Sequence, residues 1–174
     1  MLLKQIIGIG KVNVVHGAWS GDKLKSKDFP LSRKRGKAYP LTRQWRWRVS
    51  TLQINGRRFR LITSYHLQAP EFAAVLGEEV GEDCRVIARY EFHGSHDGWH
   101  VHSYCGDFDK VPTGIVKPVG TIRIPPEGAF HRHCEMLNSG SSMNDHTAAA
   151  IAADIFGLGD TIDMFSMEGI PWKT

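Results

Sequence analysis

Alternating apolar and polar residues are clearest on the two sides of the dipeptide Asn55-Gly56. Residues 45–54 (WRWRVSTLQI) and 57–66 (RRFRLITSYH) are rich in β-branched and aromatic side chains, which favour strands. Asn-Gly supplies the positive φ angles of a two-residue type I′ turn, and such a turn fixes the register of a hairpin. We therefore expect four cross-strand pairs, Trp45–His66, Trp47–Ser64, Leu52–Phe59 and Ile54–Arg57.

Patterns elsewhere along the chain predict mostly strands. Residues 1–15 contain a β-branched run broken by two glycines, which indicates one or two strands. Pro70 followed by EFAAVLGEEVG indicates a short helix that ends at Gly77 or Gly81. Strand patterns return in three further segments, residues 84–93, 99–105 and 129–137.

The last predicted element is a helix over residues 144–156 (NDHTAAAIAADIF), with Ser142 or Asn144 as its N-cap and Gly157 just beyond its end. Because the predicted strands outnumber the helices, we expect an α+β fold with a mainly antiparallel sheet and one or two packing helices. The length fits a single globular domain, residues 1–174. The sequence shows neither a bilayer-spanning apolar run nor a signal-peptide pattern, so we expect a cytoplasmic protein with no membrane partner.

Charge is distributed unevenly along the chain. The net charge is +4, yet residues 23–60 hold 13 of the 22 Lys and Arg residues and a single acidic residue, Asp28. A block of this kind either faces a polyanion or stays disordered. The segment from Ser20 to Pro40 has few apolar residues, two prolines and two glycines, which indicates a basic, mobile loop at about residues 20–43.

Cations and aromatic side chains alternate in the hairpin that follows this loop. Such a mixture suits phosphate contact and base stacking, so the sequence favours a nucleic acid, DNA or RNA, as the partner. Core packing is the alternative for the aromatic residues, and we expect it for at least half of Trp45, Trp47, Phe59 and Tyr65. The residues predicted to bind nucleic acid are Arg33, Lys34, Arg35, Arg43, Trp45, Arg46, Trp47, Arg48, Arg58 and Arg60.

Histidines cluster in the second half of the chain, where seven of the nine lie between residues 93 and 146. In a strand, the side chains at positions i and i+2 point the same way. His100 and His102 therefore share one face, together with Tyr104, and His131 and His133 share one face of their own strand. Each pair can offer two imidazoles to one ion.

The register of the hairpin that ends in His100 and His102 decides which residues join this pair. A four-residue loop, 95–98, places His93 opposite His100 and Glu91 opposite His102, whereas a loop over 94–98 places Phe92 and Tyr90 there. The first register gathers three imidazoles and a carboxylate, a set that suits Zn²⁺ or Mn²⁺, with Mg²⁺ as a further candidate. The predicted metal ligands are His93, His100, His102 and Glu91.

The segment Trp99-His100-Val101-His102 resembles the strand motif of the HUH endonucleases, a group that includes plasmid replication initiators, relaxases and some transposases. The resemblance covers about a dozen residues. It implies that His100 and His102 bind a divalent metal that polarises a scissile phosphate of single-stranded DNA, often with a third Glu, Asp or His ligand. In that family a helical tyrosine then attacks. The predicted C-terminal helix here contains no tyrosine, so hydrolysis by metal-activated water is the alternative.

A metal-free mechanism uses some of the same residues. His102 with His131 or His133 would act as general base and general acid, and Arg132 or Arg89 would stabilise the charged transition state. We therefore expect a nucleic-acid-acting hydrolase, either an endonuclease or a phosphodiesterase. The alternative is a non-catalytic nucleic-acid-binding or inhibitor protein, whose histidines are hydrogen-bonded on a polar sheet face. The catalytic candidates are His100, His102, His131, His133 and Tyr104.

Overall fold

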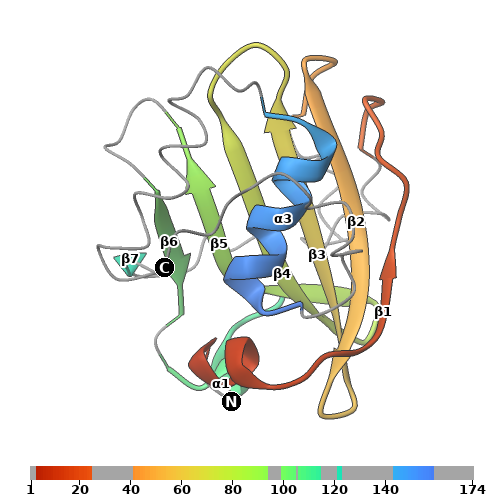
Figure 1. Cartoon of the computed structure of the whole chain (residues 1–174). Coiled ribbons are helices and arrows are strands. Elements are labelled where there is room, and N and C mark those ends of the chain that lie inside the picture. The colour runs from red at the N-terminus through yellow and green to blue at the C-terminus, as the bar shows by residue number, and fades with distance from the viewer. Residues whose placement is uncertain are drawn as a thin grey trace, which may run out of the picture.

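In the part of the chain that the structure describes, seven antiparallel strands follow one another in chain order across a single sheet (Figure 1). The computed structural model describes residues 3–24, 41–93, 99–104, 106–114, 121–122 and 143–158. Within these residues, two α-helices and a 3-10 helix accompany the sheet, which confirms the α+β class. The elements are α1 (Leu3–Gly8), β1 (Val12–His16), β2 (Trp45–Ile54), β3 (Arg57–His66), β4 (Phe72–Val80), β5 (Asp83–Phe92), β6 (His100–Ser103), η2 (Phe108–Lys110), β7 (Thr121–Ile122) and α3 (Asp145–Phe156).

The hairpin of β2 and β3 has the register that its Asn-Gly turn predicts. Asn55 and Gly56 have φ angles of 50° and 73°, as a type I′ turn requires. All four predicted cross-strand pairs are present. The C-terminal helix is also confirmed, because the Asn144 side chain accepts a hydrogen bond from the Thr147 amide at 2.9 Å and Gly157 adopts a left-handed φ of 59° at its end.

The helix predicted after Pro70 is wrong, because these residues form β4. All seven residues from Phe72 to Glu78 are buried, since the strand lies between β3 and β5 and is covered on both faces. A strand covered on both faces shows no alternation, so its short apolar run cannot be distinguished by periodicity from a buried helix. Gly81, one predicted helix end, instead has a φ of 60° between β4 and β5.

The prediction for residues 1–15 is wrong in its first half. Residues Leu3–Gly8 form the short helix α1, and only Val12–His16 form a strand. Leu3 and Ile6 are both buried whereas Gln5 is exposed, and a spacing of three residues places two side chains on the same side of a helix. The strand predicted at 129–137 lies outside the described residues.

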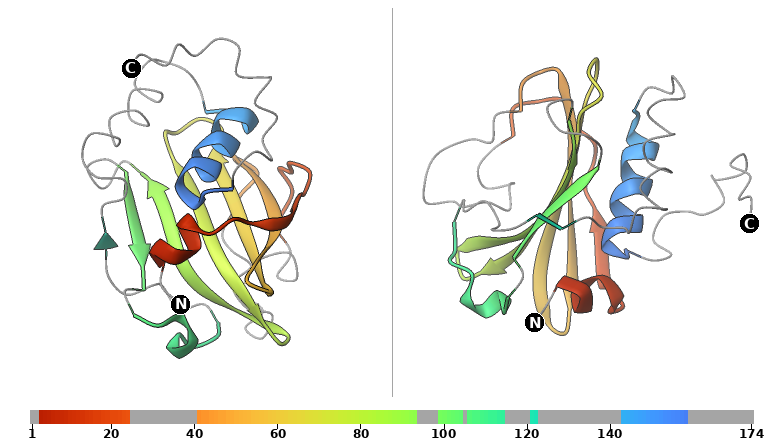
Figure 2. Two further views of the ribbon diagram at one scale, coloured as in Figure 1. Left: turned by 60° about the horizontal axis from the view of Figure 1, so that its bottom comes forward. Right: turned by 90° about the vertical axis from the view of Figure 1, so that its left-hand side faces the viewer.

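The two faces of the sheet differ in what covers them. Both α1 and α3 lie against one face (Figure 2), which we call the helix face. The main core fills this interface. The opposite face, which we call the histidine face, carries a smaller apolar cluster of Leu24, Leu41, Ile62, Val75 and Val86. None of the helices in the described ranges is long and apolar enough to cross a membrane.

Candidate metal centre

Strands β5 and β6 pair in a register that differs from both predicted alternatives. Glu91 lies opposite His100, and Arg89 lies opposite His102. Both predictions were wrong because the connection between the strands is longer than either assumed: it spans residues 93–99. The observed register is displaced by two residues from the first alternative. A shift of two residues keeps every side chain on its face, so Glu91 still joins His100 and His102.

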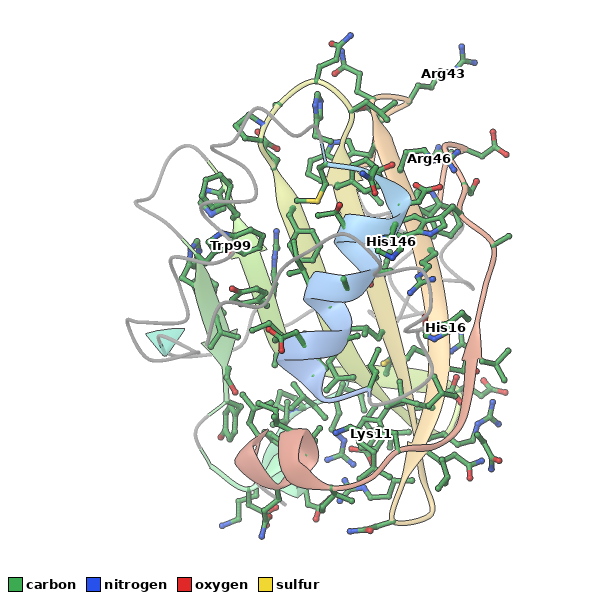
Figure 3. All side chains as sticks on the ribbon, in the orientation of Figure 1. Lys11, His16, Arg43, Arg46, Trp99 and His146 are labelled. Atoms are coloured by element: carbon green, nitrogen blue, oxygen red, sulfur yellow. The ribbon has the colours of Figure 1, made fainter. Side chains whose placement is uncertain are left out.

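Large apolar side chains on the helix face fix the orientation of this segment. The rings of Tyr90 and Trp99 stack at 5.1 Å with an interplanar angle of 19°, and Phe72 and Phe92 pack against Trp99 at 5.3 and 5.2 Å. Trp99, labelled in Figure 3, is 1% exposed. Because successive strand residues alternate between faces, the burial of Tyr90 and Val101 directs the neighbouring polar side chains to the histidine face.

Glu91 occupies the centre of a compact cluster on the histidine face. Its Oε1 atom lies 3.2 Å from Nε2 of His100, its direct cross-strand neighbour, and 3.1 Å from Nε2 of His102, its diagonal neighbour. Nε2 of His93, two residues along the chain, lies 3.7 Å from the same oxygen. Three imidazoles therefore converge on one carboxylate oxygen.

The second oxygen of Glu91 has a different partner. Nε of Arg89 forms an ion pair with Oε2, and Arg89 is also the direct cross-strand neighbour of His102. The four groups around Glu91 thus occupy its i−2, i+2, cross-strand and diagonal positions. In the sequence this arrangement corresponds to Arg-x-Glu-x-His facing His-x-His.

Exposure of the side chains increases from one side of the cluster to the other. The exposed fraction is 4% for Glu91, 11% for His100, 15% for His102 and 26% for His93. The carboxylate is therefore at the base of the cluster, and His93 is at its solvent side.

The geometry fits a metal ion as well as it fits hydrogen bonds. The ligand atoms of Glu91, His100 and His102 all lie within 4.8 Å of one another. Two ligands that each lie about 2.1 Å from one tetrahedral ion are about 3.4 Å apart, close to the observed 3.1 and 3.2 Å. The same separations also permit direct hydrogen bonds from imidazole to carboxylate. Two histidines and one glutamate match the donor set of hydrolytic zinc sites, which keep a further position open for water.

Tyr104 does not join the cluster, so the prediction that it shares a face with the two histidines is wrong. Strand β6 ends at Ser103, and the regular alternation of side chains ends with it. Tyr104 packs against the main core of the helix face. The other predicted catalytic residues, His131 and His133, lie outside the described residues.

Most of the described residues that we predicted to bind nucleic acid have partners within the protein. Arg46, labelled in Figure 3, donates to Asp145 at the N-terminal end of α3, and Arg58 and Arg60 both pair with Glu79. The guanidinium of Arg48 lies 5.1 Å from the ring centroid of Trp19. Arg43 is exposed, and Arg33, Lys34 and Arg35 lie outside the described residues.

The aromatic residues of the β2–β3 hairpin behave largely as core residues. Phe59 and Tyr65 are 1% and 4% exposed, which confirms that at least half of the four pack in the core. Trp45 packs edge-on against His66 at 5.3 Å, and the indole of Trp47 donates to the Asp22 carbonyl at 2.8 Å. Both tryptophans are half-buried against the apolar cluster of the histidine face.

A second buried carboxylate escaped the sequence prediction. Glu78 on β4 is 5% exposed and accepts two hydrogen bonds from Arg57, at 2.6 and 2.7 Å. Nε of Arg85 approaches it at 3.1 Å, and Asp109 of η2 accepts from Arg57 at 2.7 Å. No sequence motif indicates this group, because Arg57, Glu78 and Arg85 come together only through the register of three strands.

Comparisons of the chain with protein-family models, with curated proteins and with solved structures found no match. Functional inference therefore rests on the residues of this chain and their geometry.

Proposed function

We propose that the protein is a metal-dependent hydrolase of nucleic acids in which Glu91, His100 and His102 bind one divalent ion. The observation that carries this proposal is the convergence of imidazole nitrogens on Oε1 of Glu91, at 3.1 Å for His102 and 3.2 Å for His100. Imidazole and carboxylate groups together suit Zn²⁺ and Mn²⁺. His93 stands farther out, at 3.7 Å, so the three nearer ligands leave part of the coordination shell for water and substrate.

An ion with three protein ligands supports hydrolysis in a simple way. When bound, such an ion would lower the pKa of a water ligand to about 7 and so supply hydroxide near neutral pH. In the hydrolysis the water oxygen would form a new bond to phosphorus as the ester P–O bond breaks, the attacking water losing one proton and the leaving oxygen gaining one. The increasing exposure from Glu91 to His93 supplies a solvent side from which a phosphodiester can approach.

The position of the basic sequence block supports a polyanionic substrate. Leu24 and Leu41 lie at the two ends of its most basic part, and both belong to the apolar cluster of the histidine face, which also contains Val75. Val75 lies directly opposite Arg89, which lies directly opposite His102. The sequence between these two leucines contains six cations and one acid. Both ends of a strongly basic segment therefore lie on the histidine face. The apolar cluster that holds them includes Val75 of β4, two strands from His102 of β6.

A non-catalytic nucleic-acid-binding protein is the second candidate. One observation favours it: Glu91 already has partners for both oxygens, Arg89 at Oε2 and His100 at Oε1. A buried carboxylate satisfied in this way can be purely structural.

The cytoplasmic location stays a prediction from the sequence.

A cleavage assay separates these two functions. Single-stranded and duplex DNA and RNA are incubated with the protein in EDTA, Zn²⁺, Mn²⁺ or Mg²⁺. We expect metal-dependent cleavage by the wild type and at least a hundredfold loss in His102→Ala, since a ligand matters more than an outer-shell partner, whose removal costs about 10–100-fold. Glu82→Gln, in the exposed turn between β4 and β5, serves as the control and keeps its activity. Nucleic-acid binding by the wild type without cleavage under any metal favours the second candidate.

A further inference from the structure

We propose that Arg89 is a positioning residue that holds Oε2 of Glu91 so that only Oε1 faces the metal ion. This inference rests on the proposed metal site. It concerns how the glutamate binds the ion, and therefore which ions the site accepts.

The division of the two carboxylate oxygens is the evidence for this role. Arg89 pairs with Oε2, whereas His93, His100 and His102 all approach Oε1. Each oxygen thus has its own set of partners. The set at Oε1 can donate lone pairs to an ion, whereas the guanidinium at Oε2 has none to offer.

The strand arrangement leaves Arg89 well placed for this contact. Arg89 and Glu91 are two residues apart on β5 and point to the same face, and Val75 and His102 flank Arg89 on the neighbouring strands. On β4 the residue opposite Glu91 is Ala73, whose methyl group offers no polar contact. The side chains that approach Glu91 are three histidines and Arg89. The imidazoles can ligate a metal ion, whereas the guanidinium of Arg89 cannot.

A glutamate held in this way binds an ion through one oxygen only. Ca²⁺ takes six to eight oxygen ligands, so a site that offers one oxygen of Glu91 beside two imidazoles disfavours it. Zn²⁺ and Co²⁺ accept few ligands and bind imidazole well. Arg89 therefore biases the site toward these ions and keeps open the position where a substrate would bind.

Titration with Co²⁺ tests this role, because the visible absorption of protein-bound Co²⁺ reports its coordination number. We expect the wild type to bind Co²⁺ with the intense absorption of a four- or five-coordinate ion. Arg89→Gln should weaken Co²⁺ binding about 10–100-fold, the usual effect of losing an outer-shell partner, and reduce the absorption as Glu91 becomes free to bind through both oxygens. Arg89→Lys retains a positive charge near Oε2 but lacks the planar guanidinium group. Its Co²⁺ affinity and absorption should lie between those of the wild type and of Arg89→Gln.

Arg60→Gln is the matched control. Arg60 pairs with Glu79 on the same face, so its loss removes a comparable ion pair without altering the Co²⁺ spectrum. An Arg89→Gln protein with wild-type affinity and spectrum would overturn the positioning role while leaving the metal site intact. If Arg89→Gln does not fold, wild-type Co²⁺ affinity in Arg89→Lys overturns it instead. A wild type that binds no Co²⁺ contradicts the metal site itself, together with the role of Arg89.

Discussion

Glu78 and Glu91 lie on adjacent strands, are both almost fully buried, and face opposite sides of the sheet. Their partners differ in kind. Glu78 is held by the guanidinium groups of Arg57 and Arg85, whereas Oε1 of Glu91 meets imidazoles. Guanidinium groups donate hydrogen bonds but cannot ligate a metal, whereas neutral imidazoles can. A buried carboxylate is therefore not by itself a sign of a functional site. The chemistry of its partners determines whether it can take part in binding a metal ion.

The two glutamates also differ in what they connect. Glu78 joins β3, β5 and η2 through Arg57, Arg85 and Asp109, so its contacts hold one end of the sheet together. Glu91 gathers groups from β5 and β6 at a place with a solvent side. We assign stability to the first group and metal chemistry to the second, and substitutions at Glu78 and at His102 separate these two assignments.

The largest effect on stability is expected for Glu78→Gln. Removing one partner of a buried ion pair leaves the other charge uncompensated and costs about 3–5 kcal/mol. Because Arg57 and Arg85 keep some contact with solvent, we expect the free energy of unfolding, measured with urea, to fall by about 3 kcal/mol, the lower end of this range. A loss below about 1 kcal/mol would remove the structural role that we assign to Glu78.

The next effect is expected for His102→Ala in the presence of metal. A ligand at a hundredfold excess over its dissociation constant stabilises the folded protein by about 2.7 kcal/mol. Thermal unfolding of the wild type should therefore shift upward with Zn²⁺, and His102→Ala should lose this shift at the same concentration. In EDTA the two proteins should unfold within about 1 kcal/mol of each other. An equal Zn²⁺ shift in both proteins would place the ion elsewhere.

A smaller effect is expected for Asp145, a carboxylate nearer to solvent than either glutamate. Burial alone would raise the pKa of Asp145, but hydrogen bonds from Arg46 and Tyr65 outweigh burial and hold this pKa below its usual value. Such a depressed pKa contributes stability that is present above about pH 3.9 and is lost as the pH falls through the folded-state pKa.

Asp145→Asn should accordingly lower the free energy of unfolding at pH 7 by about 1 kcal/mol, as for a hydrogen-bonded pair near the surface. The difference from the wild type should shrink as the pH is lowered below 4. Urea unfolding at several pH values measures it, and a difference that grows toward acid pH would contradict the assigned sign.

Local chemistry made the β2–β3 hairpin predictable. Asn55-Gly56 specifies its turn, and the turn length then determines every pair of the two strands. The sequence between Phe92 and His100 does not specify the length of the loop, so it left two registers open, and the structure has a third. Glu91 was nevertheless a correct choice of neighbour for the two histidines, because the observed register preserves the face of each residue.

The remaining differences have the same physical origin. Residues 72–78 lack alternation because both faces of β4 are covered, and single-sequence periodicity cannot then separate strand from helix. The pairing of Arg89 with Oε2 of Glu91 was likewise not predicted, although its signal was present as Arg and Glu two residues apart on one strand face. Which oxygen a cation takes depends on side-chain geometry, which the sequence does not contain.

The number of metal ions bound per chain tests the central claim most directly. Wild type, Glu91→Gln and Glu78→Gln are dialysed against Zn²⁺, under conditions where each is folded by circular dichroism, and their metal content is then measured by mass spectrometry. With Glu91 as a metal ligand, we predict one ion per chain in the wild type and in Glu78→Gln, and none in Glu91→Gln. Equal metal content in the two variants, or none in the wild type, would contradict it.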